Sequence, residues 1–144
     1  PRQNDDSRCG PRWSPGTPAL ADGMLYVPTG DGDVLVVDTN AAQEAWWWSS
    51  GNALAGVQAY TRDARSVLSS PVVSGNVVIV GASDGNIVAL DRRTGAVCWS
   101  DSLDAPVIST PALSGNLLVC GASDGWLYGW TGTTESGAST DSTK

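Results

Sequence analysis

The chain has 144 residues, no histidine, and a formal net charge of -7, with 15 acidic and 8 basic side chains. This acidity repels phosphate backbones and anionic lipid surfaces, which argues against general nucleic-acid or membrane binding. Its three cysteines lack CxxC spacing, so a structural zinc site is also unexpected. The sequence contains no run of 18 or more apolar residues, the length that predicts a transmembrane helix.

Residues 1–16 form a polar leader that begins at Pro1 without a methionine or a signal-peptide pattern. We therefore expect a processed or truncated chain. Within this leader, Trp13 is a candidate for a strand that precedes the first repeat. Cys9, beside a glycine and a proline, is the best candidate among the cysteines for an interchain or redox role.

Three segments that begin at Thr17, Ser70 and Thr110 align with one another without gaps. Their opening prolines are spaced 53 and then 40 residues apart, and so are the glycines of the turn that follows in each copy. A repeat of 40 residues, with an insertion of 13 residues in the first copy, explains both spacings.

The middle copy, residues 70–109, shows the pattern of one repeat most clearly. Short apolar and β-branched runs alternate with turn signals, of which Ser83-Asp84-Gly85-Asn86 is the strongest. No helical periodicity interrupts these runs. Each repeat therefore predicts four short antiparallel strands, and the three copies predict an all-β chain of about three β-propeller blades.

The predicted domains follow from these boundaries: blade 1 at residues 17–69 with its insertion at 47–69, blade 2 at 70–109, and a partial blade 3 at 110–130. Residues 131–144 are rich in Thr, Ser and Gly and predict a flexible tail or linker. Propellers close with about four to eight blades, so this chain alone predicts an incomplete ring. We expect the remaining blades to come from a longer parent chain or, second, from self-association.

The segment from Ala89 to Trp99 reads Ala-Leu-Asp-Arg-Arg-Thr-Gly-Ala-Val-Cys-Trp. It resembles the tryptophan-docking motif A-x-D-x-x-T-G-x-x-x-W of the pyrroloquinoline quinone (PQQ) dehydrogenase-like propellers, and the likeness covers about residues 17–130. In the first copy Ala41 and Ala42 replace the threonine and glycine. The third copy has Gly-Trp-Thr in place of Ala-Leu-Asp and ends without a docking tryptophan.

The resemblance implies that blade packing is the role of six residues: Trp46, Trp99, Asp38, Asp91, Thr94 and Gly95. A large ring near the end of an outer strand buries roughly 150 to 250 Å² against the neighbouring blade. The aspartate and the Thr-Gly pair would fix the turn that precedes the ring.

Enzymes of this family hold PQQ and a calcium ion near a catalytic aspartate, and commonly carry two adjacent cysteines. The sequence has no adjacent cysteines and no segment that matches the catalytic or metal-binding motifs. The resemblance therefore implies the non-enzymatic branch: a protein-interaction or assembly scaffold without catalytic, cofactor-binding or metal-binding residues. The alternative is a fragment of a PQQ-dependent quinoprotein oxidoreductase, with PQQ and calcium held outside this chain. The resemblance also favours a periplasmic or extracellular location.

An acidic cluster and the insertion are the remaining candidate sites. Asp31-Gly32-Asp33 with Asp38 offers oxygen ligands to calcium, but Asp31-Gly32 aligns with the hairpin turns of the other copies, which explains it better. Loops on rigid scaffolds often bind partners, and aromatic and arginine side chains are common at binding hot spots. We therefore predict a recognition surface on the insertion, made by Trp47, Trp48, Tyr60, Arg62 and Arg65.

Two simpler interpretations belong beside these candidates. Trp47 or Trp48 can merely cover the outer edge of its blade. Cys98 and Cys120 lie in strand-like apolar runs, and we expect both to be buried.

Overall fold

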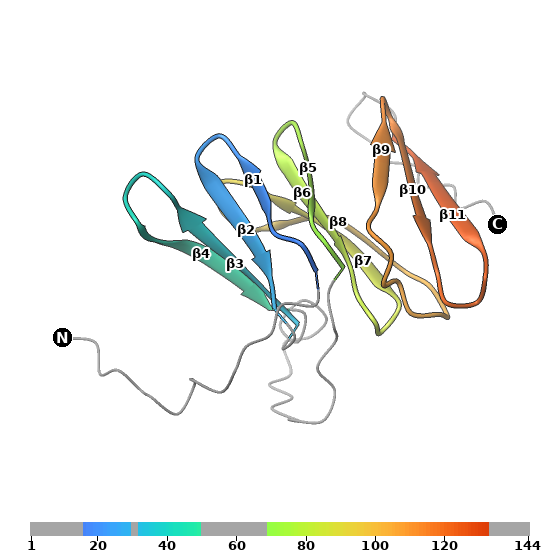
Figure 1. The fold of residues 1–144 in the computed structure, drawn as a ribbon. Coiled ribbons are helices and arrows are strands. Elements are labelled where there is room, and N and C mark those ends of the chain that lie inside the picture. Colours follow the sequence, from blue (N-terminus) through green and yellow to red (C-terminus); the bar gives the residue numbers. More distant parts are fainter. Residues whose placement is uncertain (1–15, 30–31, 50–68, 133–144) are drawn as a thin grey trace, which may run out of the picture.

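The computed structural model describes residues 16–29, 32–49 and 69–132, and every regular element in these ranges is a β-strand (Figure 1). The strands form three separate antiparallel sheets, each built from consecutive segments of the chain. The predicted all-β class with propeller blades is thereby confirmed. No helix in these ranges is long and apolar enough to cross a membrane.

Blades 1 and 2 each have four strands in sequential order. Blade 1 contains β1 (Ala19–Ala21), β2 (Met24–Pro28), β3 (Asp33–Asp38) and β4 (Gln43–Ser49). Blade 2 contains β5 (Val72–Ser74), β6 (Val77–Gly81), β7 (Asn86–Asp91) and β8 (Val97–Ser102). Blade 3 has three strands among the described residues: β9 (Ala112–Ser114), β10 (Leu117–Gly121) and β11 (Leu127–Thr131).

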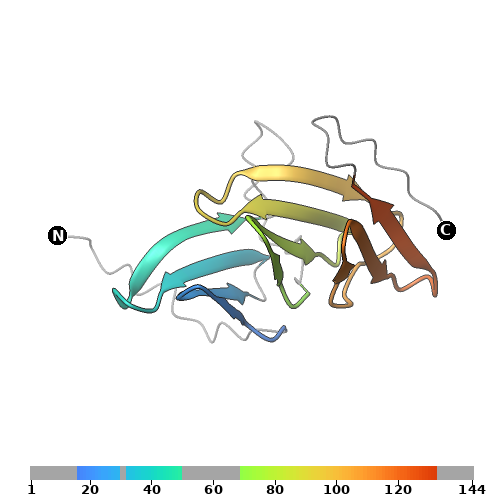
Figure 2. The same cartoon turned by 90° about the horizontal axis from the view of Figure 1, so that it is seen from above.

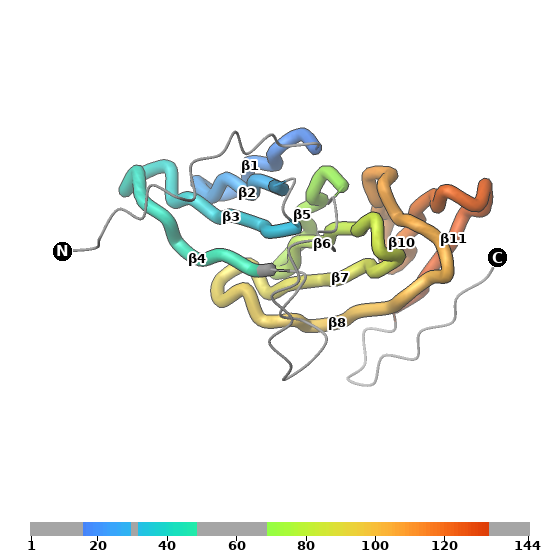
Figure 3. The backbone as a smooth tube through the Cα atoms, turned by 90° about the horizontal axis from the view of Figure 1, so that it is seen from below, coloured from blue at the N-terminus to red at the C-terminus, as the bar shows by residue number. Residues whose placement is uncertain are grey.

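The three blades lie side by side along an arc. The first strands, β1, β5 and β9, are neighbours along its inner side, whereas β4 and β8 lie on its outer side (Figure 2). The view from below shows the same fan of strands, with blade 2 between the other two (Figure 3). This arrangement is the one expected for consecutive blades of a propeller.

Two apolar layers hold the arc together, one on each side of blade 2. The layer shared by blades 1 and 2 contains Tyr26, Val34, Val36, Val78, Val80, Ala82, Val88 and Leu90. The layer shared by blades 2 and 3 contains Ile79, Ile87, Ala89, Val107, Leu118, Cys120, Tyr128 and Trp130. Alternate side chains of β6 and β7 enter different layers, which explains why these strands are apolar on both faces.

Candidate functional site

Each complete blade carries a β-bulge in its outer strand. The pairing register shifts between Val36 and Val37 in blade 1, and between Ala89 and Leu90 in blade 2. The shifts leave Ala45 of β4 and Cys98 of β8 as the extra residues, immediately before the two predicted docking tryptophans. A bulge bends its strand and redirects the next side chain.

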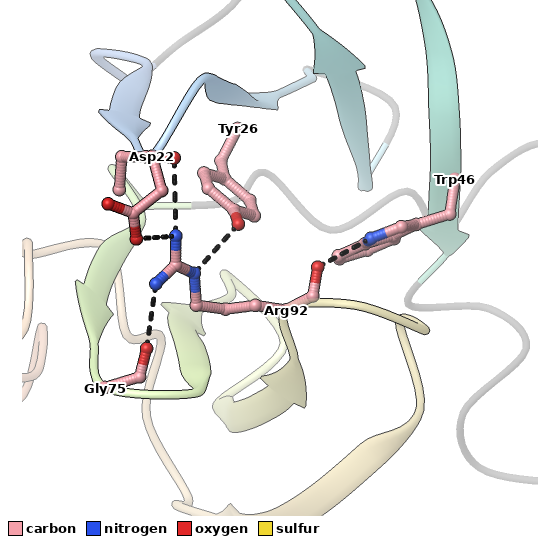
Figure 4. Close-up of polar contacts among 6 residues, drawn as sticks. Asp22, Tyr26, Trp46, Gly75 and Arg92 are labelled. Carbon is pink, nitrogen blue, oxygen red and sulfur yellow. Dashed lines mark hydrogen bonds and ion pairs between the residues drawn. The ribbon is translucent and has the colours of Figure 1, made fainter.

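The side chain of Trp46 projects from β4 at this bulge and packs on the β7–β8 turn of blade 2. Its indole nitrogen donates a hydrogen bond of 2.9 Å to the backbone carbonyl of Arg92 (Figure 4). The ring lies so close to Gly95 that a Cβ atom there would be 2.7 Å from Trp46 Cε3. Gly95 also has φ of +75°, a conformation that glycine adopts at low cost. The contact thus needs a ring from one blade and a glycine from the next.

The turn that receives this ring is built around Asp91. One carboxylate oxygen accepts hydrogen bonds from the backbone N–H groups of Arg93 at 2.8 Å and Thr94 at 3.0 Å. The other accepts one from the Asn76 side chain at 2.9 Å. These hydrogen bonds, first that from the Arg93 backbone, hold the pKa of Asp91 below its ordinary value.

Asp38 forms the equivalent turn in blade 1, where it accepts hydrogen bonds from the backbone of Asn40 at 2.8 Å and of Ala41 at 3.1 Å. Ala42 stands at the position of Gly95 and also has a positive φ, of +51°. The two turns therefore share their aspartate anchor and backbone conformation although only one keeps the Thr-Gly pair.

Arg92 fastens blade 2 to blade 1 from the same turn (Figure 4). Its Nε donates to the Tyr26 hydroxyl at 3.0 Å, and one terminal nitrogen donates to the Gly75 carbonyl at 2.8 Å. The other terminal nitrogen donates to the Ala21 carbonyl at 3.3 Å and forms an ion pair of 2.9 Å with Asp22. The hydrogen bond with Tyr26 is the largest cause that raises the pKa of Arg92. We call this group of residues the Arg92 clamp.

The clamp borders an open groove of about 460 Å³ between the two blades. The residues that line the groove are Asp22, Met24, Tyr26, Ala45, Trp46, Asn76, Arg92 and Arg93. Because the arginine and its partners already bind one another, the polar chemistry of the groove serves blade packing.

The contact between blades 2 and 3 uses different side chains. Trp99 meets Trp130 edge to face, with ring centroids 5.8 Å apart and an angle of 72° between the planes. The Trp130 indole nitrogen donates to an Asp101 carboxylate oxygen at 2.7 Å. The Tyr128 hydroxyl donates to Asp124 at 2.6 Å, which raises the pKa of Tyr128 to about 12.

Sequence reasoning missed the residues that complete these contacts: Arg92, Tyr26, Asp22, Trp130 and Asp101. Arg92 occupies a variable position of the docking motif. Trp130 stands where the middle copy has Leu90, and this departure from the repeat was the available signal for its role.

Of the five predicted recognition residues, the structure describes two, Trp47 and Trp48. Trp47 and Trp48 lie in β4, because pairing of β3 with β4 continues to Ser49, and their partners are Leu35 and Val34. Trp48 packs against the layer shared with blade 2, whereas Trp47 is 53% exposed. Tyr60, Arg62 and Arg65 lie outside the described residues, as do Asp31, Cys9 and Trp13.

The two cysteines in the described ranges differ from each other. Cys120 is buried as expected, and burial raises the pKa of its thiol to about 11. The expectation for Cys98 was wrong, since Cys98 is exposed. Cys98 lies in β8, the edge strand of its sheet, where the paired residue Val97 is also exposed, and the bulge leaves Cys98 as the unpaired extra residue. Over the described part of the chain, no group of three or more cysteine or acidic side chains gathers as metal ligands.

Blades 1 and 3 each have one face that no described blade covers. In blade 1, Leu25 and Leu35 alternate with residues of the first apolar layer and therefore face away from blade 2. Leu20, 66% exposed, and Trp47 are their strand partners on this face, which we call the blade 1 open face.

The opposite end of the arc has a matching surface. Leu118 and Trp130 enter the second apolar layer, so the alternating residues Leu117 and Leu127 face away from blade 2. These two leucines are 39% and 68% exposed. We call this surface the blade 3 open face.

Blades of this architecture, linked by docking tryptophans, define a PQQ-like β-propeller. The family model described as "Outer membrane protein assembly factor BamB" matches residues 48–138, more than half of the chain. The chain therefore belongs to this family of PQQ-like repeats.

Individual proteins show the same likeness. The chain is 32% identical over 90 residues to the quinohemoprotein alcohol dehydrogenase ADH IIB of Pseudomonas putida. This alignment covers 62% of this chain and 13% of the relative. The chain is 33% identical over 85 residues to the outer membrane protein assembly factor BamB of Shewanella oneidensis. This alignment covers 59% of this chain and 21% of the relative. The chain thus spans only a small part of these relatives.

The crystal structure of BamB from Moraxella catarrhalis resembles the fold with a TM-score of 0.66 and 22% sequence identity. The match covers 85% of this chain and 34% of that chain. At this identity the comparison shows the fold alone.

Proposed function

We propose that this chain is a non-catalytic PQQ-like propeller segment that acts as a protein-interaction or assembly scaffold. The observation that carries this proposal is the Arg92 clamp, where the arginine of one blade binds Tyr26, Ala21 and Asp22 of the neighbouring blade. The match to a family described as an assembly factor supports the same function. The partners would be the remaining blades, from a longer parent chain or from self-association, together with a further protein.

The second candidate function is a fragment of a PQQ-dependent oxidoreductase, which the likeness to a quinohemoprotein alcohol dehydrogenase favours. Because this candidate holds PQQ and calcium outside this chain, the titration that separates the two functions uses a longer chain that contains this segment. PQQ and calcium are added to it, with absorbance and reduction of an electron-acceptor dye in the presence of an alcohol as readouts. For a scaffold, neither readout changes, whereas a PQQ-dependent dehydrogenase responds under the same conditions. Saturable PQQ binding by that longer chain would favour the oxidoreductase.

We also propose that Trp47, Trp48, Tyr60, Arg62 and Arg65 contribute to a partner-binding surface. Of the two tryptophans, Trp47 is the more accessible, because Trp48 packs against the first apolar layer. The double variant Tyr60→Ala with Arg62→Ala should capture less of a protein partner from solubilised cell envelope than the parent chain does. Its thermal unfolding midpoint should stay the same, since removal of side chains that serve partner recognition weakens binding more than folding.

Arg93→Ala is the matched control for this capture experiment, because it removes an exposed arginine in the β7–β8 turn of blade 2. It should leave capture unchanged. Equal capture by the double variant and the parent would contradict a role for the insertion. The family resemblance supports a periplasmic or extracellular location as part of the same proposal.

A further inference from the structure

The contact between blades 1 and 2 uses side chains that the next contact along the arc lacks. Arg92 of blade 2 binds the Tyr26 hydroxyl and the Asp22 carboxylate of blade 1. One repeat later, Ile79 and Gly75 stand at the positions of Tyr26 and Asp22. Neither has a side-chain oxygen, so the face that blade 2 turns toward blade 3 has no side-chain acceptor for an arginine at these positions.

A second pair of positions exchanges its members between the two contacts. One position lies in the outer strand of the preceding blade and the other in the third strand of the following blade. Between blades 1 and 2 these positions hold Trp48 and Leu90, and between blades 2 and 3 they hold Asp101 and Trp130. The Trp130 indole donates to the Asp101 carboxylate at 2.7 Å. The tryptophan therefore comes from the preceding blade at one contact and from the following blade at the other.

These differences oppose the packing of blade 3 directly on blade 1. Such a contact would bring Trp130 against Trp48, so that two indole rings compete for a space that holds one in each native contact. It would also leave the buried Tyr26 hydroxyl without Arg92 as its donor, because blade 3 has Gly132 at that position. Crowding and an unpaired buried hydroxyl both disfavour this arrangement.

Packing of blade 2 on the blade 2 of another copy is disfavoured for the opposite reason. Leu90 would meet Asp101, so neither side would supply an indole ring and the space that it fills would be left empty. The Arg92 guanidinium would lie beside Ile79, without a hydroxyl or carboxylate acceptor. Each incorrect pairing thus loses polar partners and mismatches the volume of the contact.

We propose that these side chains select which blade packs on which, and thereby fix the order of the blades along the arc. The selecting residues form one set at each contact: Arg92, Tyr26, Asp22, Trp48 and Leu90 between blades 1 and 2, and Asp101 and Trp130 between blades 2 and 3. The docking tryptophans Trp46 and Trp99 occur in both outer strands and do not distinguish the contacts. Blade order matters equally to a scaffold and to an oxidoreductase segment, so this selection goes beyond either proposed function.

The first test places each incorrect residue pair at the contact between blades 2 and 3 of the full chain. Asp101→Trp creates the pair of two tryptophans and should lower the folding equilibrium constant about 10- to 100-fold through crowding. Trp130→Leu creates the pair of leucine and aspartate and should lower it about 10- to 100-fold through the lost ring. Urea unfolding measures both losses.

The double variant Asp101→Trp with Trp130→Leu is the decisive one, because it recreates the pair of Trp48 and Leu90. Its folding equilibrium constant should lie within about 10-fold of that of the parent, far above the product of the two single losses. Asp101→Trp with Leu113→Ala is the matched control. Leu113 borders the same apolar layer but lies in β9, on the inner side of the arc and away from the outer strand β8 (Figure 2), so its loss should add to that of Asp101→Trp.

A second test concerns the Arg92 clamp. Tyr26→Phe removes the hydroxyl that accepts from Arg92 and should lower the folding equilibrium constant of the parent about fivefold. In an Arg92→Thr background, which carries the residue that blade 1 has at Thr39, the same change should lower it at most about twofold, because the hydroxyl has already lost its donor.

Three results would overturn the inference. They are additive losses in the double variant Asp101→Trp with Trp130→Leu, an equal rescue of Asp101→Trp by Leu113→Ala, and equal effects of Tyr26→Phe in the two backgrounds. Circular dichroism shows whether each variant folds. If a single variant does not fold, a folded double variant still supports selection between blades, and an unfolded double variant contradicts it.

Discussion

Gly95 is a residue at which packing of one blade on the next leaves no room for a side chain. We predict that Gly95→Ala lowers the free energy of unfolding by about 2 kcal/mol, through the cost of a left-handed conformation and the displacement of the Trp46 ring. The ring atom Cε3 lies 2.7 Å from the position of the new Cβ, so the indole must shift from its hydrogen bond to Arg92. Urea unfolding of parent and variant measures the difference.

Ala42 provides the matched control, because it occupies the equivalent turn position of blade 1 with φ of +51°. Ala42→Gly relieves a backbone cost of about 1 to 2 kcal/mol but increases the entropy of the unfolded chain by about 0.5 to 1 kcal/mol. We expect a net stabilisation of about 1 kcal/mol or less. If both substitutions changed stability in the same direction and by the same amount, packing of the ring on Gly95 would not be the cause.

At the scale of elements, the Arg92 clamp joins the β7–β8 turn to the β1–β2 and β5–β6 turns. We predict that Arg92→Lys lowers the free energy of unfolding by about 2 kcal/mol, because lysine keeps the charge but loses the planar fork that reaches several acceptors. Asp22→Asn should cost less than about 1 kcal/mol, since the Asp22 side chain is 83% exposed and exposed ion pairs contribute little. Equal losses in the two variants would show that the ion pair, and not the fork, is the main contribution.

The strands themselves could be predicted from the sequence, for a local reason. Apolar runs such as Val77–Val80, bounded by glycine-containing turns, define a strand and its ends without knowledge of its neighbours. Contacts between strands and between blades could not be predicted in this way, because they depend on residues far apart in the sequence. The burial of Cys98 was predicted from its apolar neighbours, but exposure at a bulge depends on the register between β7 and β8, which the run of residues does not contain.

The residues of the candidate site also fall into two groups: those whose role follows from their own segment, and those whose role depends on contacts with other segments. The role of Asp91 was predictable because it fixes a turn within its own segment. Arg92 was not predictable, because its acceptors belong to Tyr26, Gly75 and other residues on separate strands and turns. The distinction between Trp47 and Trp48 also required the pairing of β4, which sends one ring into the core and leaves the other exposed.

For the whole molecule, the arc is stabilised chiefly by surfaces between blades. Blade 2 contributes to both apolar layers, whereas blades 1 and 3 each contribute to one. The exposed leucines and Trp47 of the two open faces are consequently side chains that a further blade would bury. The stability of blades 1 and 3 therefore depends on whether a further blade covers their open faces.

The docking of Trp46 on the turn of the next blade also affects how such a chain evolves. Donor ring and receiving glycine belong to successive copies, so tandem duplication of one whole repeat reproduces the contact without a new mutation. A change in the ring can be compensated only by a change in the following copy. Mutations in neighbouring copies are therefore expected to be correlated. A copy that loses its ring releases the turn of its neighbour from the steric requirement for glycine, while the left-handed backbone of that turn still favours it.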